Sequence, residues 1–399
     1  MGRTVRLLLV VDMGEGTCRA PTPRVIRVVG GFALFVVSAS SACAAGPSDE
    51  NASVESGAVT GASVDCSQVQ VLGLGSPATG TPAPKLVGRY DMTNPAGPKF
   101  DWSGNTISAR FEGTEVSVGI MVPDGQKNGF VFEATVDDLS PIKFTVPGGR
   151  SSYRLASGLP AGVHEVTVMR SSEALAGTTI YTGFNLGSHG TFLPPIEHPR
   201  KIEFVGDSMT CGYESIYFAY GSITARALSA DATTLCFPGK GVVLNYSESP
   251  GDADAKTTIP QYYERTLATQ AEPTWSFADP EPQVVVLNAG TSDFLRDVDQ
   301  NGVADGIDLD AFYNGYLAFV QFVRARRPNA HIFLAVSPML TDEFPLANAR
   351  SNMRDALDHV VTTVASSGDA KVYRIEFVDM DQRMMADELV SVIRAVTCW

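Results

Sequence analysis

Histidine is scarce in this chain, with five in 399 residues, and none lies in residues 360–399. A catalytic serine needs a positioned base, most often histidine, so this gap restricts the chemistry open to the C-terminal part. Lysine and arginine are also few, 30 against 44 acidic residues, which gives a formal net charge of −14. Nucleic acids and anionic membrane surfaces require clustered basic side chains. The composition therefore argues against both as partners.

The apolar run over residues 28–37 is too short to span a bilayer. Two arginines precede it and small residues follow it, which is the arrangement of a secretory signal. We therefore predict an export signal within residues 1–45, with the true start codon downstream of the first residue. Cys43 would carry a lipid anchor, or cleavage would follow Ala44 or Ala45. Either outcome predicts an extracellular, periplasmic or membrane-anchored lipoprotein location.

The pattern of residues divides the remaining chain into a tether and two domains. Residues 46–84 are rich in Ser, Gly and Pro, which is typical of a flexible tether. Short alternating strands recur over residues 85–195 without a helix-length pattern, which predicts an all-β sandwich. Such a sandwich serves equally as a carbohydrate-binding module or a spacer. Apolar runs and helical stretches alternate over residues 200–397, which predicts a three-layer α/β domain with a doubly wound parallel sheet.

Three segments of the α/β domain carry the chemical signal. Gly206-Asp207-Ser208 follows a short apolar strand, and such a turn lifts a nucleophilic hydroxyl to the carboxyl edge of a sheet. This tripeptide is equally common in an ordinary strand-to-helix turn, so it is weak on its own. Gly239 lies in a second loop, where a glycine N–H can approach an acyl oxygen. Ser292 follows a buried apolar strand in a third loop.

Residues 84–397 resemble the SGNH (GDSL-like) hydrolases, and most of all the two-domain acetyl esterases of carbohydrate esterase family two. The resemblance implies a jelly-roll sandwich before the hydrolase domain and hydrolysis of O-acetyl groups on a polysaccharide or oligosaccharide, with no cofactor required. It assigns Ser208 as the nucleophile and Gly239 to the oxyanion hole. Ser292 stands where the family has an asparagine of the oxyanion hole.

The general base of this family, an Asp-x-x-His loop before the last helix, has no counterpart here. Only four residues, 379–382, separate the last apolar strand from the final amphipathic helix. His189, on a loop of the β domain, is the one substitute that reaches across a domain interface in principle. The sequence leaves three readings open: an esterase, an inactive relative kept as a carbohydrate-binding or surface protein, and an incomplete copy of an active enzyme.

A second chemical signal is a loop with oxygen side chains at positions one, three, five, nine and twelve and glycine at six, which matches the calcium-loop pattern. Aspartate at position twelve replaces the usual glutamate, and the alternative is an acidic solvated insertion. If calcium binds, it would be structural, and its ligands would be Asp297, Asp299, Asn301, Asp305 and Asp308.

No Cys-x-x-Cys spacing of the metal-binding type occurs among the six cysteines. Once the leader is removed, Cys66, Cys211, Cys236 and Cys398 remain. Pairing of Cys66 with Cys398 would join the ends of the mature chain, and pairing of Cys211 with Cys236 would lie near the active-site edge. Free buried thiols are the alternative. The oligomeric state is not encoded in any recognisable pattern.

Overall fold

The structure is a computed structural model that describes residues 76–77, 82–123, 129–137, 139–213, 215–248 and 254–399. The predicted leader, Cys43, Cys66 and nearly all of the tether lie outside the described residues. Among the helices of the described part, none is long and apolar enough to cross a membrane.

The first domain is all-β, as predicted, and is built around two long strands, β4 and β7, that pair antiparallel along most of their length. Shorter strands pair with these two or with each other, and one short 3-10 helix, Ala174–Ala176, interrupts the series. The strands are β2 Lys85–Val87, β3 Lys99–Phe100, β4 Thr106–Val122, β5 Phe130–Val136, β6 Ile142–Val146, β7 Gly149–Arg170, β8 Thr179–Asn185 and β9 Thr191–Leu193.

Strict alternation explains why this domain has one apolar interior. Along β4 the side chains of Ile107, Ala109 and Phe111 are buried, while those between them are only partly buried. Because successive strand residues point to opposite faces, every second residue enters the core and the others face outward. The core is completed by aromatic rings, including Phe100 and Phe132.

The second domain is a five-stranded parallel sheet with strand order β12-β11-β15-β16-β17. Its strands are β11 Arg200–Gly206, β12 Ala230–Cys236, β15 Val284–Asn288, β16 His331–Val336 and β17 Val372–Glu376. Its helices are α1 Ser208–Cys211, α2 Tyr220–Ala227, α3 Ile259–Tyr262, α4 Thr291–Phe294, α5 Leu309–Arg326, α6 Ala349–Ser366 and α7 Gln382–Thr397. Small two-stranded pairings accompany the sheet: β1 Ser76–Pro77 with β10 Ile196–Glu197, and β13 Arg265–Leu267 with β14 Gln270–Thr274.

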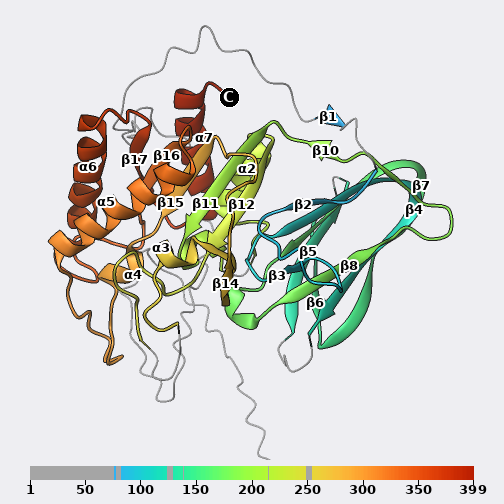
Figure 1. Cartoon of the computed structure of the whole chain (residues 1–399), viewed down its shortest axis with the longest axis horizontal. Coiled ribbons are helices and arrows are strands. Elements are labelled where there is room, and N and C mark those ends of the chain that lie inside the picture. The colour runs from blue at the N-terminus through green and yellow to red at the C-terminus, as the bar shows by residue number, and fades with distance from the viewer. Residues whose placement is uncertain (1–75, 78–81, 124–128, 138, 214, 249–253) are drawn as a thin grey trace, which may run out of the picture. The chain divides into compact units, whose positions relative to one another are not determined.

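Helices cover both faces of this sheet (Figure 1), which confirms the three-layer prediction. Val285 and Leu287 of β15 pack in the cluster that contains residues of α5 and α6, whereas Val284 and Val286 pack in the cluster that contains residues of α2 and α7. A parallel strand covered on both faces is apolar throughout, and all five residues of β15 are buried. The edge strand β12 was not predicted, because its residues, ADATTLC, form no apolar run.

The two domains are joined by buried polar contacts. Trp102 of the β domain donates its indole N–H to the Thr266 carbonyl at 3.0 Å. The Arg89 guanidinium donates to the carbonyls of Tyr263 and Arg265 at 2.6 and 2.9 Å and lies 3.5 Å from the Glu203 carboxylate. These side chains are buried, so separating the domains would leave polar groups without partners at considerable cost.

Candidate active site

The three predicted site segments meet at the carboxyl edge of the parallel sheet. Ser208 follows β11, Gly239 follows β12 and Ser292 follows β15, and these three strands are direct neighbours in the sheet. Gly206, the last residue of β11, is in register with Cys236 and Asn288. A side chain at Gly206 would collide with the Asn288 carbonyl and the Thr210 hydroxyl, so the close approach of the strands requires glycine here.

The nucleophile turn is tightly held. Asp207 is the N-cap of α1, and its buried carboxylate accepts from the Met209 N–H at 3.1 Å. Burial raises the pKa of Asp207 to about 6. Ser208 is only partly buried, and the nearby Tyr213 hydroxyl donates to the Met209 Sδ at 3.1 Å. As the first residue of the helix, Ser208 has a backbone N–H without an intrahelical acceptor, which is the kind of donor that an oxyanion hole uses.

Gly239 adopts a left-handed conformation with φ of 74°, which glycine tolerates without strain. Its carbonyl accepts from the Tyr246 N–H at 2.9 Å, so the carbonyl is fixed within its own loop. Gly239 lies three residues past the end of β12, in the loop beside the nucleophile turn. This geometry suits the predicted oxyanion role, which stays a prediction.

Asp293, which no sequence pattern singled out, organises the loop after Gly239. Its fully buried carboxylate accepts from the N–H groups of Val242, Val243 and Leu244 at 2.7, 2.8 and 2.7 Å. Burial raises the pKa of Asp293 to about 7, against the effect of these three donors. An acidic residue in the loop after an apolar strand, one position after the expected oxyanion residue, was the available signal.

A disulfide joins the nucleophile helix to the strand before the oxyanion loop. Cys211 ends α1 and Cys236 ends β12, and their Cα atoms lie 5.5 Å apart. This confirms the predicted pairing of Cys211 with Cys236. Cys398 is disulfide-bonded as well, with a partner outside the described residues, so the pairing of Cys66 stays a prediction.

Ser292 lies within α4 and its side chain is almost entirely buried. Gly290, the N-cap of α4, has φ of 114° and lies against the side chains of Phe312 and Met353, which sets where this short helix begins. The structure therefore brings Ser292 to the expected edge of the sheet. Its role as an oxyanion donor stays a prediction.

The base side of the site is short, as the sequence indicated. Residues 377–381 alone connect β17 to α7. Asp381 is the N-cap of α7 and accepts from the N–H groups of Arg383 and Met384, so the helix starts one residue earlier than expected. The Gln382 side chain accepts from the Tyr220 N–H at 2.9 Å and thereby holds α7 against α2. No histidine lies in this connection.

The other histidines lie elsewhere and have other partners. His198 contacts Asp231 at 2.9 Å near the amino end of β12, and His331 begins β16, so both lie at the amino edge of the sheet. His359 stacks on Tyr313 with ring centroids 4.0 Å apart. His164 is bound to Asp137 at 2.7 Å within the β domain.

His189 is exposed on the loop between β8 and β9, which lies well along β4 from the place where the β domain meets β12. Its neighbour Gly190 lies against Gly113 of β4, whereas Gly104, just before β4, lies against Thr234 of β12. Gly104 and Gly113 are nine positions apart, which corresponds to about 30 Å along an extended strand. The loop of His189 is therefore remote from the contact between Gly104 and β12.

The predicted calcium loop forms tight turns of its own. Asp297 accepts from the N–H groups of Asn301 and Gly302 at 3.0 and 2.8 Å, and Gly302 has φ of 83°. Asp308, however, is the N-cap of α5 and accepts from the Ala311 N–H. The other carboxylates accept backbone N–H groups too: Asp299 from Asn301, and Asp305 from Val298. In the described chain, no three His, Cys, Asp or Glu side chains converge as metal ligands, and calcium stays a prediction.

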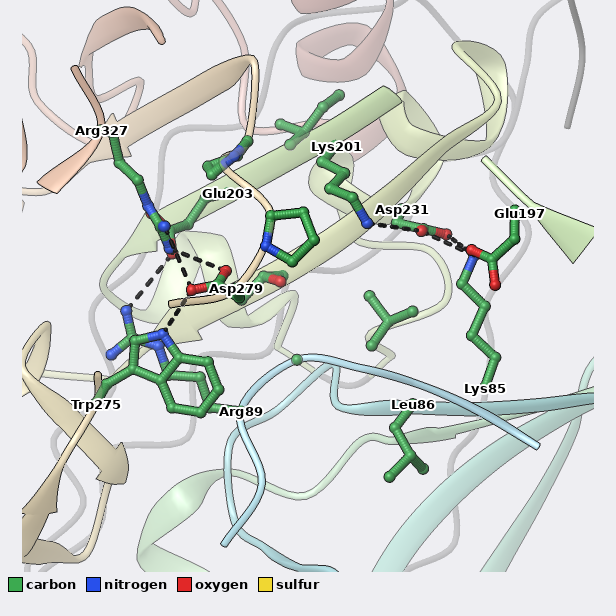
Figure 2. A pocket seen from close by; sticks show the side chains of 16 residues that line it. Lys85, Leu86, Arg89, Glu197, Lys201, Glu203, Asp231, Trp275, Asp279 and Arg327 are labelled. Carbon is green, nitrogen blue, oxygen red and sulfur yellow. Dashed lines mark hydrogen bonds and ion pairs between the residues drawn. The ribbon is translucent and has the colours of Figure 1, made fainter. Parts of the chain in front are cut away.

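A charged cavity of about 270 Å³ lies away from the candidate active site. Lys201 and Asp231 line it near the amino ends of their strands, at the sheet edge opposite Ser208. Figure 2 shows its charged side chains in mutual ion pairs, with Lys85 bound to Glu197 and Asp231, and Arg327 bound to Glu203 and Asp279. Because these charges are paired with each other, they serve the junction between the domains.

A serine at a strand-to-helix turn, a clamped glycine loop on the neighbouring strand and a preceding β domain define a two-domain hydrolase of the GDSL-like class. Residues 204–391 match the family described as GDSL-like Lipase/Acylhydrolase, and residues 86–195 match the one described as Carbohydrate esterase 2 N-terminal. The chain belongs to the family two carbohydrate esterases.

Solved structures and curated relatives agree with this assignment. The structure of a family two carbohydrate esterase from Clostridium thermocellum in complex with cellohexaose is similar, with a TM-score of 0.69 and 33% identity over 78% of this chain and 98% of that one. Cellulase/esterase CelE of Acetivibrio thermocellus is 35% identical over 74% of this chain, which spans only 35% of that protein. Acetylxylan esterase / glucomannan deacetylase of Cellvibrio japonicus is 25% identical over 67% of this chain and 74% of that protein.

Proposed function

We propose that this protein is a serine esterase that removes O-acetyl groups from carbohydrate, working slowly because its nucleophile has no histidine base. The observation that carries the proposal is the pairing of two loops on adjacent strands, one with Ser208 and one with Gly239, tied by the disulfide of Cys211 and Cys236. The substrate class, acetylated polysaccharide or oligosaccharide, follows the names of the relatives, which include an acetylxylan esterase and glucomannan deacetylase.

The chemistry begins with attack of the Ser208 Oγ on the acetyl carbonyl. The backbone N–H groups of Ser208 and Gly239, with the Ser292 hydroxyl in place of an asparagine, would stabilise the negative charge on the carbonyl oxygen. The sugar oxygen leaves with a proton, and water then releases acetate from the acyl-serine. Each proton transfer normally passes through the base, and a serine site without it keeps roughly 10³–10⁴-fold acceleration over water.

Hydrolysis of p-nitrophenyl acetate by the purified chain tests this proposal. We expect slow turnover that Ser208→Ala removes, because the variant has no nucleophile. Turnover that is fast, or that Ser208→Ala leaves unchanged, would contradict the proposal. The short 377–381 connection favours a second candidate, a carbohydrate-binding relative without activity. That candidate predicts retained binding of an acetylated oligosaccharide with no Ser208-dependent turnover.

We also propose that the protein acts outside the cytoplasm, with a lipid anchor on Cys43 or after cleavage of the leader. The disulfide of Cys211 and Cys236 supports this proposal, since structural disulfides persist in oxidising compartments. Labelling of expressing bacteria with a palmitate analogue tests the anchor. Label that is lost in Cys43→Ser would support it, and label-free protein in the medium would support cleavage.

A further inference from the structure

A groove of about 420 Å³ lies between the β domain and the hydrolase domain. One wall is the outward face of β4, β5 and β7, and the other consists of α2 and β12. We call it the interdomain groove and define it by Ser108, Thr135, Thr167, Tyr217, Ser222 and Thr234. None of these residues takes part in the chemistry assigned to Ser208.

A row of three hydroxyl side chains crosses the β wall of the groove. Ser108 of β4 is in register with Thr167 of β7, and Thr167 is in register with Thr135 of β5. Their sequence neighbours Ile107 and Val168 are buried in the core, so alternation places the hydroxyls on the outward face. Neighbouring strands are about 4.8 Å apart, so the row extends over about 10 Å.

These three hydroxyls have no hydrogen-bond partner within the described residues. Each side chain is half-buried, and within the described residues none of them hydrogen-bonds to another group. Each hydroxyl offers one donor and two acceptor positions. Water or a bound polar molecule must therefore satisfy them.

The opposite wall has small side chains and one aromatic ring. Ala225, Ala230 and Ala232 leave space between the domains. The Tyr217 ring lies 3.9 Å from the Arg226 guanidinium, and the Tyr217 N–H donates to Glu133 of β5 at 3.0 Å. The Arg226 guanidinium thus packs on one face of the ring, and the Tyr217 backbone is tied to the β domain.

The charges of the groove narrow the choice of occupant. Arg110 stands in register with Glu165 on the neighbouring strand, and Lys85 forms an ion pair with Asp231. The lining also carries Arg226 and Asp137, so both signs of charge are present. A groove with both signs of charge does not suit a polyanion, and its row of hydroxyls does not suit an apolar helix. A neutral polyol provides hydroxyls for the row and an apolar ring face for Tyr217.

We propose that the interdomain groove is a carbohydrate-binding site, separate from the cleft of Ser208, that holds a neutral segment of a glycan chain. The proposal rests on the proposed function for its substrate class. A glycan bound in the interdomain groove would keep the enzyme on the polymer while an acetyl ester of the same polymer reaches Ser208. Longer residence on the polymer would compensate for slow turnover at Ser208.

Calorimetry on the full chain with xylohexaose, mannohexaose and cellohexaose tests the groove. Ser108→Leu with Thr167→Leu should weaken binding of the preferred hexaose by at least about fivefold, which corresponds to about one net hydrogen bond. Ser117→Leu is the matched control, because Ser117 is also a half-buried serine of β4 but lies outside the groove. Thr167→Val, which removes only a hydroxyl, repeats the test if the double variant folds poorly.

Hydrogen exchange locates the bound sugar. We expect the hexaose to protect peptides that cover residues 106–110 and 163–169, and Ser208→Ala to keep the same affinity. Protection confined to residues 206–213, equal affinity in the groove variants, or no binding of any hexaose at millimolar concentration would overturn the proposal. Turnover of p-nitrophenyl acetate by the groove variants should be unchanged, so failure of the groove and failure of the esterase proposal give different results.

Discussion

The nucleophile side of the candidate active site is held by many buried contacts, whereas the side where a base is expected is short and exposed. On the nucleophile side, Asp207 and Met209 are buried, Cys211 is bridged to Cys236, and Asp293 binds three successive backbone N–H groups. On the base side, five residues connect β17 to α7, and the side chains of Val378, Met380 and Met384 are exposed.

If the proposed function holds, this difference indicates which part of the site can be kept when the connection that carries the base is short. Ser208 and Gly239 follow the neighbouring strands β11 and β12, and β11 and β15 lie inside the sheet, where both faces are covered. Their positions are therefore retained with the fold. The base depends on a surface connection, which can shorten without disturbing the core.

Insertion of a loop that carries a base should have the largest effect on turnover. Insertion of an Asp-x-x-His loop between Gln382 and Arg383 should raise turnover of p-nitrophenyl acetate at least about a hundredfold, the low end of what a positioned base contributes. Because Asp381 caps α7 through the Arg383 and Met384 N–H groups, the insert should end in a new serine or aspartate cap.

An insert of equal length with alanine in place of the histidine is the control for this experiment. Adding Ser208→Ala to the repaired chain should abolish the gain. A gain in the alanine insert, or none in the histidine insert, would show that the missing base does not limit the site.

Removal of the disulfide on the nucleophile side should lower the stability of the protein. Cys211→Ala with Cys236→Ala opens a link across a sequence separation of 25 and should lower the free energy of unfolding by about 3 kcal/mol. Denaturant unfolding measures this change. An unchanged midpoint would mean that the other contacts of α1 and β12 suffice, whereas a loss of turnover larger than the loss of folded protein would indicate a positioning role.

Replacement of Asp293 by Asn should break the clamp on the oxyanion loop. The amide nitrogen would face one of the N–H groups of Val242, Val243 and Leu244, so we expect a loss of about 1–3 kcal/mol in unfolding free energy. Urea unfolding at pH 5 measures this loss, and Asp310→Asn on the exposed first turn of α5 is the control.

The pH dependence of the unfolding free energy in the unmodified protein and in Asp293→Asn gives a second test of this carboxyl group. The pKa of Asp293 is raised to about 7 in the folded protein, against about 4 in an unfolded chain. Between these values the folded state holds a proton that the unfolded state has released, so stability contributed by this group falls as pH rises from 4 to 7. This fall should be missing in Asp293→Asn, and an identical slope in both proteins would contradict the assignment.

Prediction from the sequence succeeded where the pattern was apolar and periodic. The alternating strands of the β domain and the apolar strands β11, β15 and β17 were predicted, as was the place of Ser208 after β11. The edge strand β12 was missed because its side chains are small and polar. Asp293 was missed for another reason: its partners are backbone N–H groups about fifty positions away, and no side-chain pattern records them.

The smallest expected effect concerns calcium, which would brace the loop between the oxyanion residue and α5. If calcium binds with a dissociation constant near 1 mM, 10 mM calcium should stabilise the protein by about 1.4 kcal/mol and raise the melting temperature by about 3 °C. Asp297→Ala with Asp299→Ala should abolish the shift. Asp308→Ala should lower the melting temperature with or without calcium, since Asp308 caps α5 at the Ala311 N–H. Equal melting temperatures with and without calcium in the unmodified chain would show that the turns at Asp297 are a self-contained loop and not an ion site.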